Sequence, residues 1–236
     1  MNKKYQDIKK INNLFKTKTS EEIINISINK IFKSKITYVC SFGIESAVIL
    51  HMISKINNKF PIIFINTNKL FVETIKYKND LLKLFNLENF SEIFPYQDDI
   101  KKFDPHDSLW KDDPDKCCNI RKVIPLKKKL SKYDAWFSGR KSYHNADRSE
   151  KKFIEFDEKY LISPLIDWDY KKINDYFLRF KIPRHPLFSL GYFSVGCQNC
   201  TIKSKDKKNM RSGRWANLNK TECGIHSAKW DKVGSS

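Results

Sequence analysis

The chain has 236 residues, 40% of them hydrophobic and 31% charged, which is enough for one globular domain with a full core. Its apolar runs, such as residues 61–65, are too short to span a bilayer, and no apolar segment follows the charged first ten residues. The composition therefore argues against a membrane protein. We expect a soluble, cytoplasmic protein with no membrane partner.

The formal net charge of +18 raises the question of nucleic-acid binding, because clustered Lys and Arg side chains neutralise phosphates. Here the surplus is mostly Lys, spread along the whole chain among many Asn and Ile residues. That mixture is typical of the mutational bias of an AT-rich genome, so we expect no nucleic-acid partner. A basic surface still favours a small polyanionic substrate.

The predicted elements begin with residues 1–34, where Ile and Leu recur at the three- and four-residue intervals of a helix. The predicted strands cover residues 36–40, 61–66, 91–94 and 135–138, and an irregular hairpin covers residues 153–166. The predicted helices cover residues 45–55, 71–85, 114–131 and 170–180, the last with Asp167 as its cap. This alternation predicts an α/β fold, an open and mostly parallel sheet flanked by helices. Residues 1–202 form this domain, and the polar residues 203–236 are expected to be a mobile C-terminal tail.

Three polar turns follow predicted strands, at residues 41–46, 67–70 and 139–142. Ligands of open parallel sheets bind beyond the carboxyl ends of the strands, so these turns should line one crevice. The first turn, Ser-Phe-Gly-Ile-Glu-Ser, joins a strand to a helix, where backbone N–H groups and hydroxyls favour an anion. Such a turn is also a common helix cap, so by itself it does not establish a ligand site.

Six cysteines occur in the chain, and in a cytoplasmic protein such a set favours metal binding or catalysis over disulfides. Cys117 and Cys118 are adjacent, and Cys197 and Cys200 form a CxxC pair. Four thiolates can surround a zinc ion or an iron–sulfur cluster. Adjacent cysteines disfavour zinc, but the residues alone leave the metal open. Cys40, which ends the first predicted strand, is expected to be a buried core residue.

The sixth cysteine, Cys223, lies in the polar tail within Lys-Thr-Glu-Cys-Gly-Ile-His at residues 220–226. One interpretation is a stray exposed thiol. Basic residues close to it in sequence favour a reactive thiolate instead, namely Lys220, Arg211, Arg214 and His226, whereas the adjacent Glu222 opposes one.

Taken together, these segments resemble the assimilatory adenylyl sulfate and phosphoadenylyl sulfate reductases, members of the adenine nucleotide alpha-hydrolase-like superfamily. The resemblance runs from about residue 36 to residue 226. It rests on residues 41–46, 70–74, 116–126, 136–141, 191–201, 211–215 and 220–226. Its most specific parts are the two cysteine pairs and the terminal Glu-Cys-Gly-Ile-His.

The resemblance implies a [4Fe–4S] cluster bound by Cys117, Cys118, Cys197 and Cys200, as in the branch of the family that generally prefers adenylyl sulfate. It implies that Cys223 attacks the substrate sulfur, expels AMP and holds an S-sulfocysteine, from which a thiol of thioredoxin or glutaredoxin releases sulfite. It implies that a basic group surrounds the phosphosulfate: Arg121, Lys122, Arg211, Arg214 and His226. The nucleotide would contact Ser41, Gly43, Ser46, Leu70, Gly139 and Arg140. The oligomeric state stays open, a homo-oligomer included.

One departure from the family pattern lies at residues 66–68, which read Asn-Thr-Asn where Asp-Thr-Gly is usual. It bears on nucleotide contacts and on substrate preference, because Gly reaches positive φ more easily than Asn68 does. The alternatives are a phosphoadenylyl sulfate reductase with the same mechanism, a tRNA-thiolating ATP pyrophosphatase and a zinc-bound nucleic-acid-binding module. The pyrophosphatase would need an SGGxDS-type loop, which residues 41–46 lack, and the zinc module leaves Cys223 unexplained.

Overall fold

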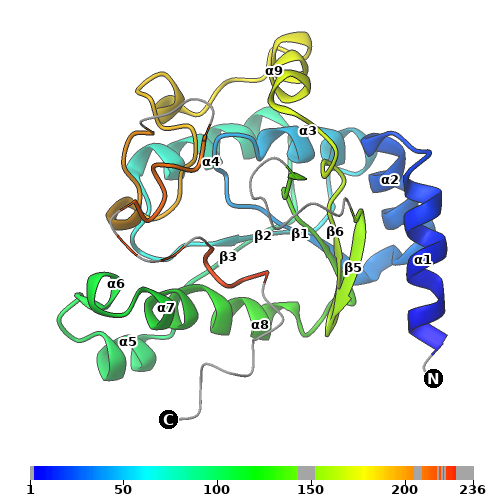
Figure 1. Ribbon diagram of the computed structural model, residues 1–236. Coiled ribbons are helices and arrows are strands. Elements are labelled where there is room, and N and C mark those ends of the chain that lie inside the picture. The colour runs from blue at the N-terminus through cyan, green and yellow to red at the C-terminus, as the bar shows by residue number, and fades with distance from the viewer. Residues whose placement is uncertain are drawn as a thin grey trace.

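Six strands form one sheet with the order β3-β2-β1-β4-β6-β5 (Figure 1). The computed structural model of the protein describes residues 3–142, 152–204, 209–216, 218, 220 and 222–226, and of residues 3–7 only the backbone. The strands are β1 (Ile36–Val39), β2 (Ile62–Ile65), β3 (Phe90–Ile93), β4 (Ala135–Phe137), β5 (Ile154–Asp157) and β6 (Lys159–Ile162). Neighbouring strands are parallel except for β5, which pairs with β6 as the predicted hairpin. The predicted open, mostly parallel sheet is therefore confirmed.

Helices cover both faces of the sheet, as Figure 1 shows. The helices are α1 (Lys3–Phe15), α2 (Ser20–Ile26), α3 (Ala47–Ile56), α4 (Val72–Leu84), α5 (Gln97–Phe103), α6 (Leu109–Asp112), α7 (Pro114–Cys118), α8 (Ile124–Leu130) and α9 (Tyr170–Arg179). On one side lie α3, α4 and α9, on the other lie α5 to α8, and α1 and α2 stand beside β5. No helix in the described ranges is long and apolar enough to cross a bilayer.

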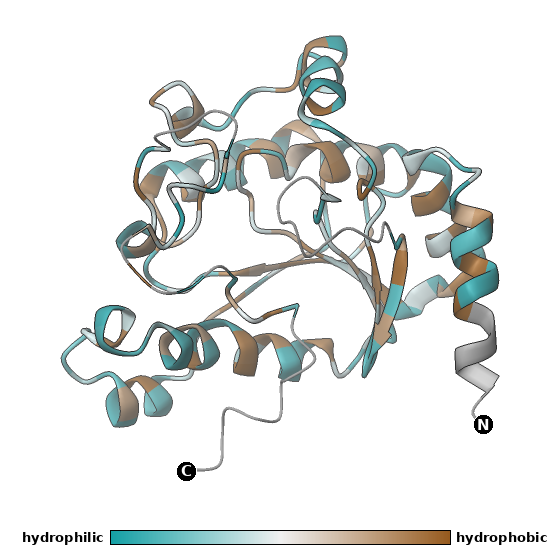
Figure 2. Ribbon diagram, in the orientation of Figure 1, coloured by the Kyte–Doolittle hydropathy of each residue, from teal (hydrophilic) through white to brown (hydrophobic). Residues whose placement is uncertain are grey.

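The central strands are buried on both faces because successive side chains point to opposite sides of the sheet. Ile62 and Phe64 join the main core beneath α3, whereas Ile63 between them joins a second apolar cluster. The same alternation occurs in β4, where Phe137 enters the main core and Trp136 the second cluster. Figure 2 shows that the strands are mostly hydrophobic, whereas hydrophobic and hydrophilic segments alternate along most of the surrounding helices.

Several helices are preceded by a residue with a short polar side chain that accepts a backbone N–H of the first turn. Thr19 and Glu22 form a capping box at the start of α2, in which each side chain accepts a backbone N–H of the other residue. The predicted cap of α9 was wrong: Asp169, not Asp167, accepts the N–H of Lys172, at 2.7 Å. The N-cap is the residue just before the first helical residue, and its side chain accepts the N–H three positions later. Because α9 begins at Tyr170, the N-cap is Asp169 and its partner is Lys172.

The predicted basic helix at residues 114–131 comprises α7, a π-helical turn (Asn119–Val123) and α8. Such turns are rare and frequently occur at functional sites. Two short helices before it, α5 and α6, were not predicted. Described residues of the tail contact the α/β domain. The N–H of Trp215 donates to the carbonyl of Cys200 at 3.0 Å, and the backbones of Arg214 and Thr201 form an isolated antiparallel β-bridge. The expected mobility of the tail stays a prediction.

Candidate active site

A cleft opens at the carboxyl ends of β1, β2 and β4, where the three polar turns meet. Most of the residues expected to bind substrate line it: Ser41, Gly43, Ser46, Leu70, Lys122, Gly139, Arg140, Arg211, Arg214 and His226. Cys223 and Cys197 also line it, whereas Arg121 does not. Segments from the start, middle and end of the chain thus contribute to one concave site.

The turn between β1 and α3 has an uncommon backbone. Phe42 has a φ of +49°, a conformation that bulky residues rarely adopt. Its fully buried ring packs edge-on against Phe64, with 5.3 Å between ring centroids, and this packing helps to hold the turn. The Ser46 hydroxyl donates to the carbonyl of Gly43 at 2.8 Å and does not cap α3. Ser46 precedes the first residue of α3 and lines the cleft, so the N-terminal end of this helix borders the cleft and its dipole favours an anion there.

Cys117 and Cys118 end α7, Cys197 precedes a 3₁₀ turn (Gln198–Cys200), and Cys200 is the last residue of that turn. All four line one small cavity next to the cleft. The N–H of Gln198 donates to the carbonyl of Lys69 at 2.7 Å, which attaches the CxxC turn to the loop after β2. Among the described residues, no three His, Cys, Asp or Glu side chains converge closely enough to bind one metal ion.

Lys122 lines both the cleft and the cysteine cavity. Burial favours its neutral form, but the thiols of Cys197 and Cys118 outweigh burial and raise its pKa above the ordinary value. Burial likewise opposes ionisation of Cys197. Lys122 and the hydroxyl of Thr67, 3.3 Å from the Cys197 sulfur, outweigh it and lower the pKa of this thiol. Burial and the neighbouring Cys118 raise the pKa of Cys117 to about 12. A protonated Lys122 therefore stands between the cysteine cavity and the cleft.

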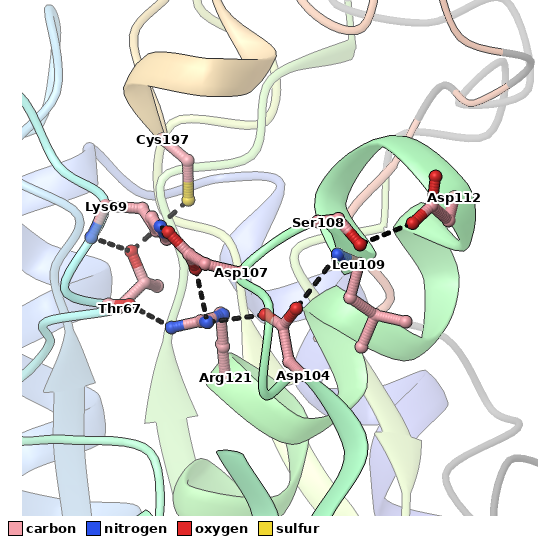
Figure 3. A network of polar contacts seen from close by, with 9 residues as sticks. All are labelled: Thr67, Lys69, Asp104, Asp107, Ser108, Leu109, Asp112, Arg121 and Cys197. Atoms are coloured by element: carbon pink, nitrogen blue, oxygen red, sulfur yellow. Dashed lines mark hydrogen bonds and ion pairs between the residues drawn. The ribbon is translucent and has the colours of Figure 1, made fainter. Parts of the chain in front are cut away.

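Arg121 is held by two aspartates, as Figure 3 shows. Its Nη2 lies 2.6 Å from Oδ2 of Asp104 and 3.0 Å from Oδ1 of Asp107, and its Nη1 donates to the carbonyl of Thr67 at 3.2 Å. The side chains of Arg121 and Asp104 are 5% and 1% exposed. Because Thr67 also contacts Cys197, this network ties the loop after α5 to the loop after β2 and to the cysteine cavity.

The described tail residues bring positive charge to the cleft. Arg211 forms an ion pair with Glu222 at 3.2 Å, and the guanidinium of Arg214 lies over the ring of Trp215, 4.3 Å from its centroid. Arg214 needs the space that Gly196 leaves: a Cβ on Gly196 would lie 2.3 Å from its Nη2. Cys223, half-buried, lines the same cleft. A thiol and two guanidinium groups therefore border one site.

Comparison with known proteins identifies the family. The family described as "Phosphoadenosine phosphosulfate reductase domain" matches residues 35–203. The chain belongs to this family. The family prediction from the sequence motifs is thus confirmed, together with the enzyme class, an oxidoreductase acting on a sulfur group.

Relatives within the reductase family are similar over most of their length. The chain is 39% identical over 206 residues to an adenosine 5′-phosphosulfate reductase of Mesorhizobium japonicum, covering 87% of this chain and 81% of the relative. It is 36% identical over 214 residues to one of Bacillus mycoides, covering 89% and 91%. Among solved structures, a phosphoadenylyl-sulfate reductase of Candida auris in a phosphate complex is similar, with a TM-score of 0.72 and 25% identity over 86% of this chain and 98% of that one.

Sequence reasoning missed several residues of this reductase site. Asp104 and Asp107 were not considered, because their loop matched no motif. Glu45 and Lys141 lay inside quoted motifs, but no pattern in the sequence indicated that they pair. Asn68 has a φ of +59°, the positive φ that the Gly usual at this position in the family reaches easily. Its N–H donates to Oδ1 of Asn66 at 3.0 Å.

Proposed function

We propose that the protein reduces adenylyl sulfate to sulfite and AMP, with Cys223 as the nucleophile. The observation that carries this proposal is the position of Cys223 in the cleft at the strand ends, beside Lys122, Arg211 and Arg214. The relatives from Mesorhizobium japonicum and Bacillus mycoides, both named adenosine 5′-phosphosulfate reductase, support the choice of substrate.

The chemistry requires a soft nucleophile, because oxygens shield the sulfur of the phosphosulfate. The Cys223 thiolate attacks sulfur, a sulfur–sulfur bond forms, the sulfur–oxygen bond to phosphate breaks, and AMP leaves with the electron pair. The enzyme then carries an S-sulfocysteine. A thiolate of thioredoxin or glutaredoxin attacks the Cys223 sulfur, sulfite leaves, and the second thiol of the donor completes the two-electron reduction by forming a disulfide.

The positive groups of the cleft favour this transfer. Charge builds on the phosphate oxygen as the sulfur–oxygen bond breaks, and fixed cations near that oxygen stabilise the transition state. Lys122, Arg211, Arg214 and His226 are the candidates for this role. Arg121 is better assigned to holding the cysteine cavity, since its guanidinium is engaged by two carboxylates and the Thr67 carbonyl.

The four cysteines of the second cavity fit an iron–sulfur cluster. A single zinc ion needs four donors converging on one point, whereas each thiolate of a cubane binds a different iron. The four thiols line one cavity, as the ligands of a single cluster must. When bound by Cys117, Cys118, Cys197 and Cys200, a [4Fe–4S] cluster would supply an electrostatic environment. We expect a brown protein with roughly four iron and four sulfide per chain. A colourless, zinc-loaded protein with full turnover would contradict this assignment.

The second candidate substrate is the 3′-phosphorylated form, which the solved relative from Candida auris favours by its name. Both substrates undergo the same chemistry at sulfur, so kcat/KM for each with thioredoxin present decides between them. We expect the higher value for adenylyl sulfate. A clear preference for the phosphorylated form would change the substrate and leave the mechanism in place.

The test of the mechanism omits the thiol donor. Anaerobic protein mixed with adenylyl sulfate should release one AMP per chain and gain the mass of one sulfonate on the peptide that contains Cys223. Cys223→Ser should do neither, because an alcohol is a far weaker nucleophile toward sulfur at neutral pH. Cys40→Ala is the matched control, since burial raises the pKa of the Cys40 thiol to about 12. Sulfonate on Cys40, or sulfite release by Cys223→Ser, would refute the assignment.

A further inference from the structure

The last described residues of the chain lie against the sheet, on the side of α8. The imidazole ring of His226 stacks on the indole ring of Trp136, with 5.1 Å between centroids and 2° between ring planes. Ile225 packs on the apolar cluster that Trp136 forms with Ile63 and Leu126. Figure 1 shows this final coloured segment crossing between the sheet and α8. Two adjacent tail residues therefore have specific partners in the domain.

Cys223 is tied to this contact by a short and bent connection. Gly224 has a φ of +82°, a conformation open to glycine at no steric cost, and it separates Cys223 from Ile225. Cys223, Ile225 and His226 all line the cleft, while Trp136 is 3% exposed in β4, two residues before the cleft residue Ser138. The position of the thiol therefore depends on where the next three residues bind.

We propose that Trp136 is a positioning residue, whose indole face binds His226 and, with the apolar cluster that takes Ile225, holds Cys223 over the cleft. The inference rests on the proposed role of Cys223 as the nucleophile. Offset stacking of two flat rings fixes both separation and orientation, which an aliphatic contact does not. Trp136 acts through the tail and has no part in the bond changes. Its loss should slow the attack on sulfur and leave the later release of sulfite unchanged.

The first experiment measures the accessibility of Cys223 without substrate. In Trp136→Leu the stack is lost, and we expect iodoacetamide to alkylate Cys223 about three- to tenfold faster than in the wild type. Trp136→Phe keeps a ring for His226 and should restore most of the wild-type rate. Should the Leu variant fail to fold, Ile225→Ser tests the same docking from the tail, outside the main core. Leu178→Ser, on an α9 side chain that is 68% exposed, is the matched control and should change nothing.

The second experiment separates the two chemical steps in full-length protein. Single-turnover transfer of sulfonate to Cys223 should slow about three- to tenfold in Trp136→Leu and in Ile225→Ser. Release of sulfite from preformed S-sulfocysteine by dithiothreitol should keep its wild-type rate, which a general loss of structure would not produce. Wild-type rates of alkylation and transfer in both variants would overturn the proposal, and so would a Phe variant as impaired as the Leu variant. Absence of sulfonate on wild-type Cys223 would instead refute the proposed function, and the alkylation rates would still report on the docking.

Discussion

The carboxylate of Glu45 lies 2.8 Å from the ammonium group of Lys141, and the two side chains are 9% and 3% exposed. Glu45 belongs to the turn after β1 and Lys141 to the turn after β4, so the pair joins two walls of the cleft. Lys141 also donates to the carbonyl of Gly139 at 2.7 Å. A buried pair of this kind fixes geometry, because removing one partner takes away a charge that compensates the other in a site with little access to water.

Lys141→Met should therefore lower the free energy of unfolding by roughly 3 kcal/mol or more. Glu45→Gln in the same chain also removes the negative charge that Lys141 compensated, and the double variant should recover a large part of the loss. Urea unfolding of both single variants and the double variant measures this coupling. Lys171→Met is the control, since Lys171 and Asp175 form an exposed pair on α9 and its loss should not be detectable. Additive single-variant effects would show that Glu45 and Lys141 act independently.

Asp104 and Asp107 contact the same guanidinium but differ in burial, with side chains 1% and 56% exposed. Burial opposes ionisation of Asp104, but Arg121 and the N–H of Leu109 outweigh it and lower its pKa. Asp104→Asn should cost roughly 3 kcal/mol of unfolding free energy at pH 7, and Asp107→Asn far less. The Asp104 contribution should fade as the pH falls below the unfolded value near 4, because the unfolded carboxylate then takes up a proton that the native carboxylate, with its lowered pKa, resists.

Metal content gives these two variants a second readout. The guanidinium that Asp104 holds also bonds the Thr67 carbonyl, and the Thr67 hydroxyl contacts Cys197. We expect Asp104→Asn to lose iron faster than wild type under a chelator, and Asp107→Asn to resemble the wild type. Equal iron retention in the two variants would show that the Arg121 network contributes to folding stability and not to retention of the metal.

Much of the fold followed from the sequence because the central strands β1, β2 and β4 are short, largely apolar on both faces and bounded by polar turns. The cysteine pairs and the cleft turns were identifiable for the same local reason, since each lies within one run of residues. The helices α5 and α6 have only seven and four residues, too few for a 3.6-residue period to be read. Pairings such as Trp136 with His226 depend on how distant segments meet in space, and no local pattern carries that information.

His185 should make stability fall on mild acidification. Its Nδ1 accepts the N–H of Leu187 at 3.2 Å, so Nε2 carries the proton and donates to the Thr74 hydroxyl at 3.0 Å. Burial lowers the pKa of His185 to about 4. The unfolded chain takes up a proton near pH 6.5 and the native protein resists it until about pH 4. Unfolding free energy should therefore decline between these values by up to about 3 kcal/mol.

The comparison variant for this prediction is His185→Gln, whose amide has both an acceptor and a donor for the same partners. Denaturant unfolding at a series of pH values should give a shallower decline for the variant than for the wild type. His51, whose pKa burial also lowers, contributes to the decline in both proteins and leaves some slope. Parallel pH profiles for the two proteins would exclude His185 as a source.

The final prediction concerns Gly196, which faces the guanidinium of Arg214. A Cβ on residue 196 would lie 2.3 to 2.7 Å from three atoms of that group, all at the flexible end of the side chain. In Gly196→Ala the guanidinium must therefore move while the backbone keeps its place, so the melting temperature should change little. If Arg214 stabilises the leaving phosphate, kcat/KM should fall by about tenfold or more. Arg214→Ala should cause a similar loss, and adding Gly196→Ala to it should cost almost nothing more, because the displaced group is already absent. Additive losses in the double variant would mean that Gly196 acts through the backbone of the CxxC segment and not through Arg214.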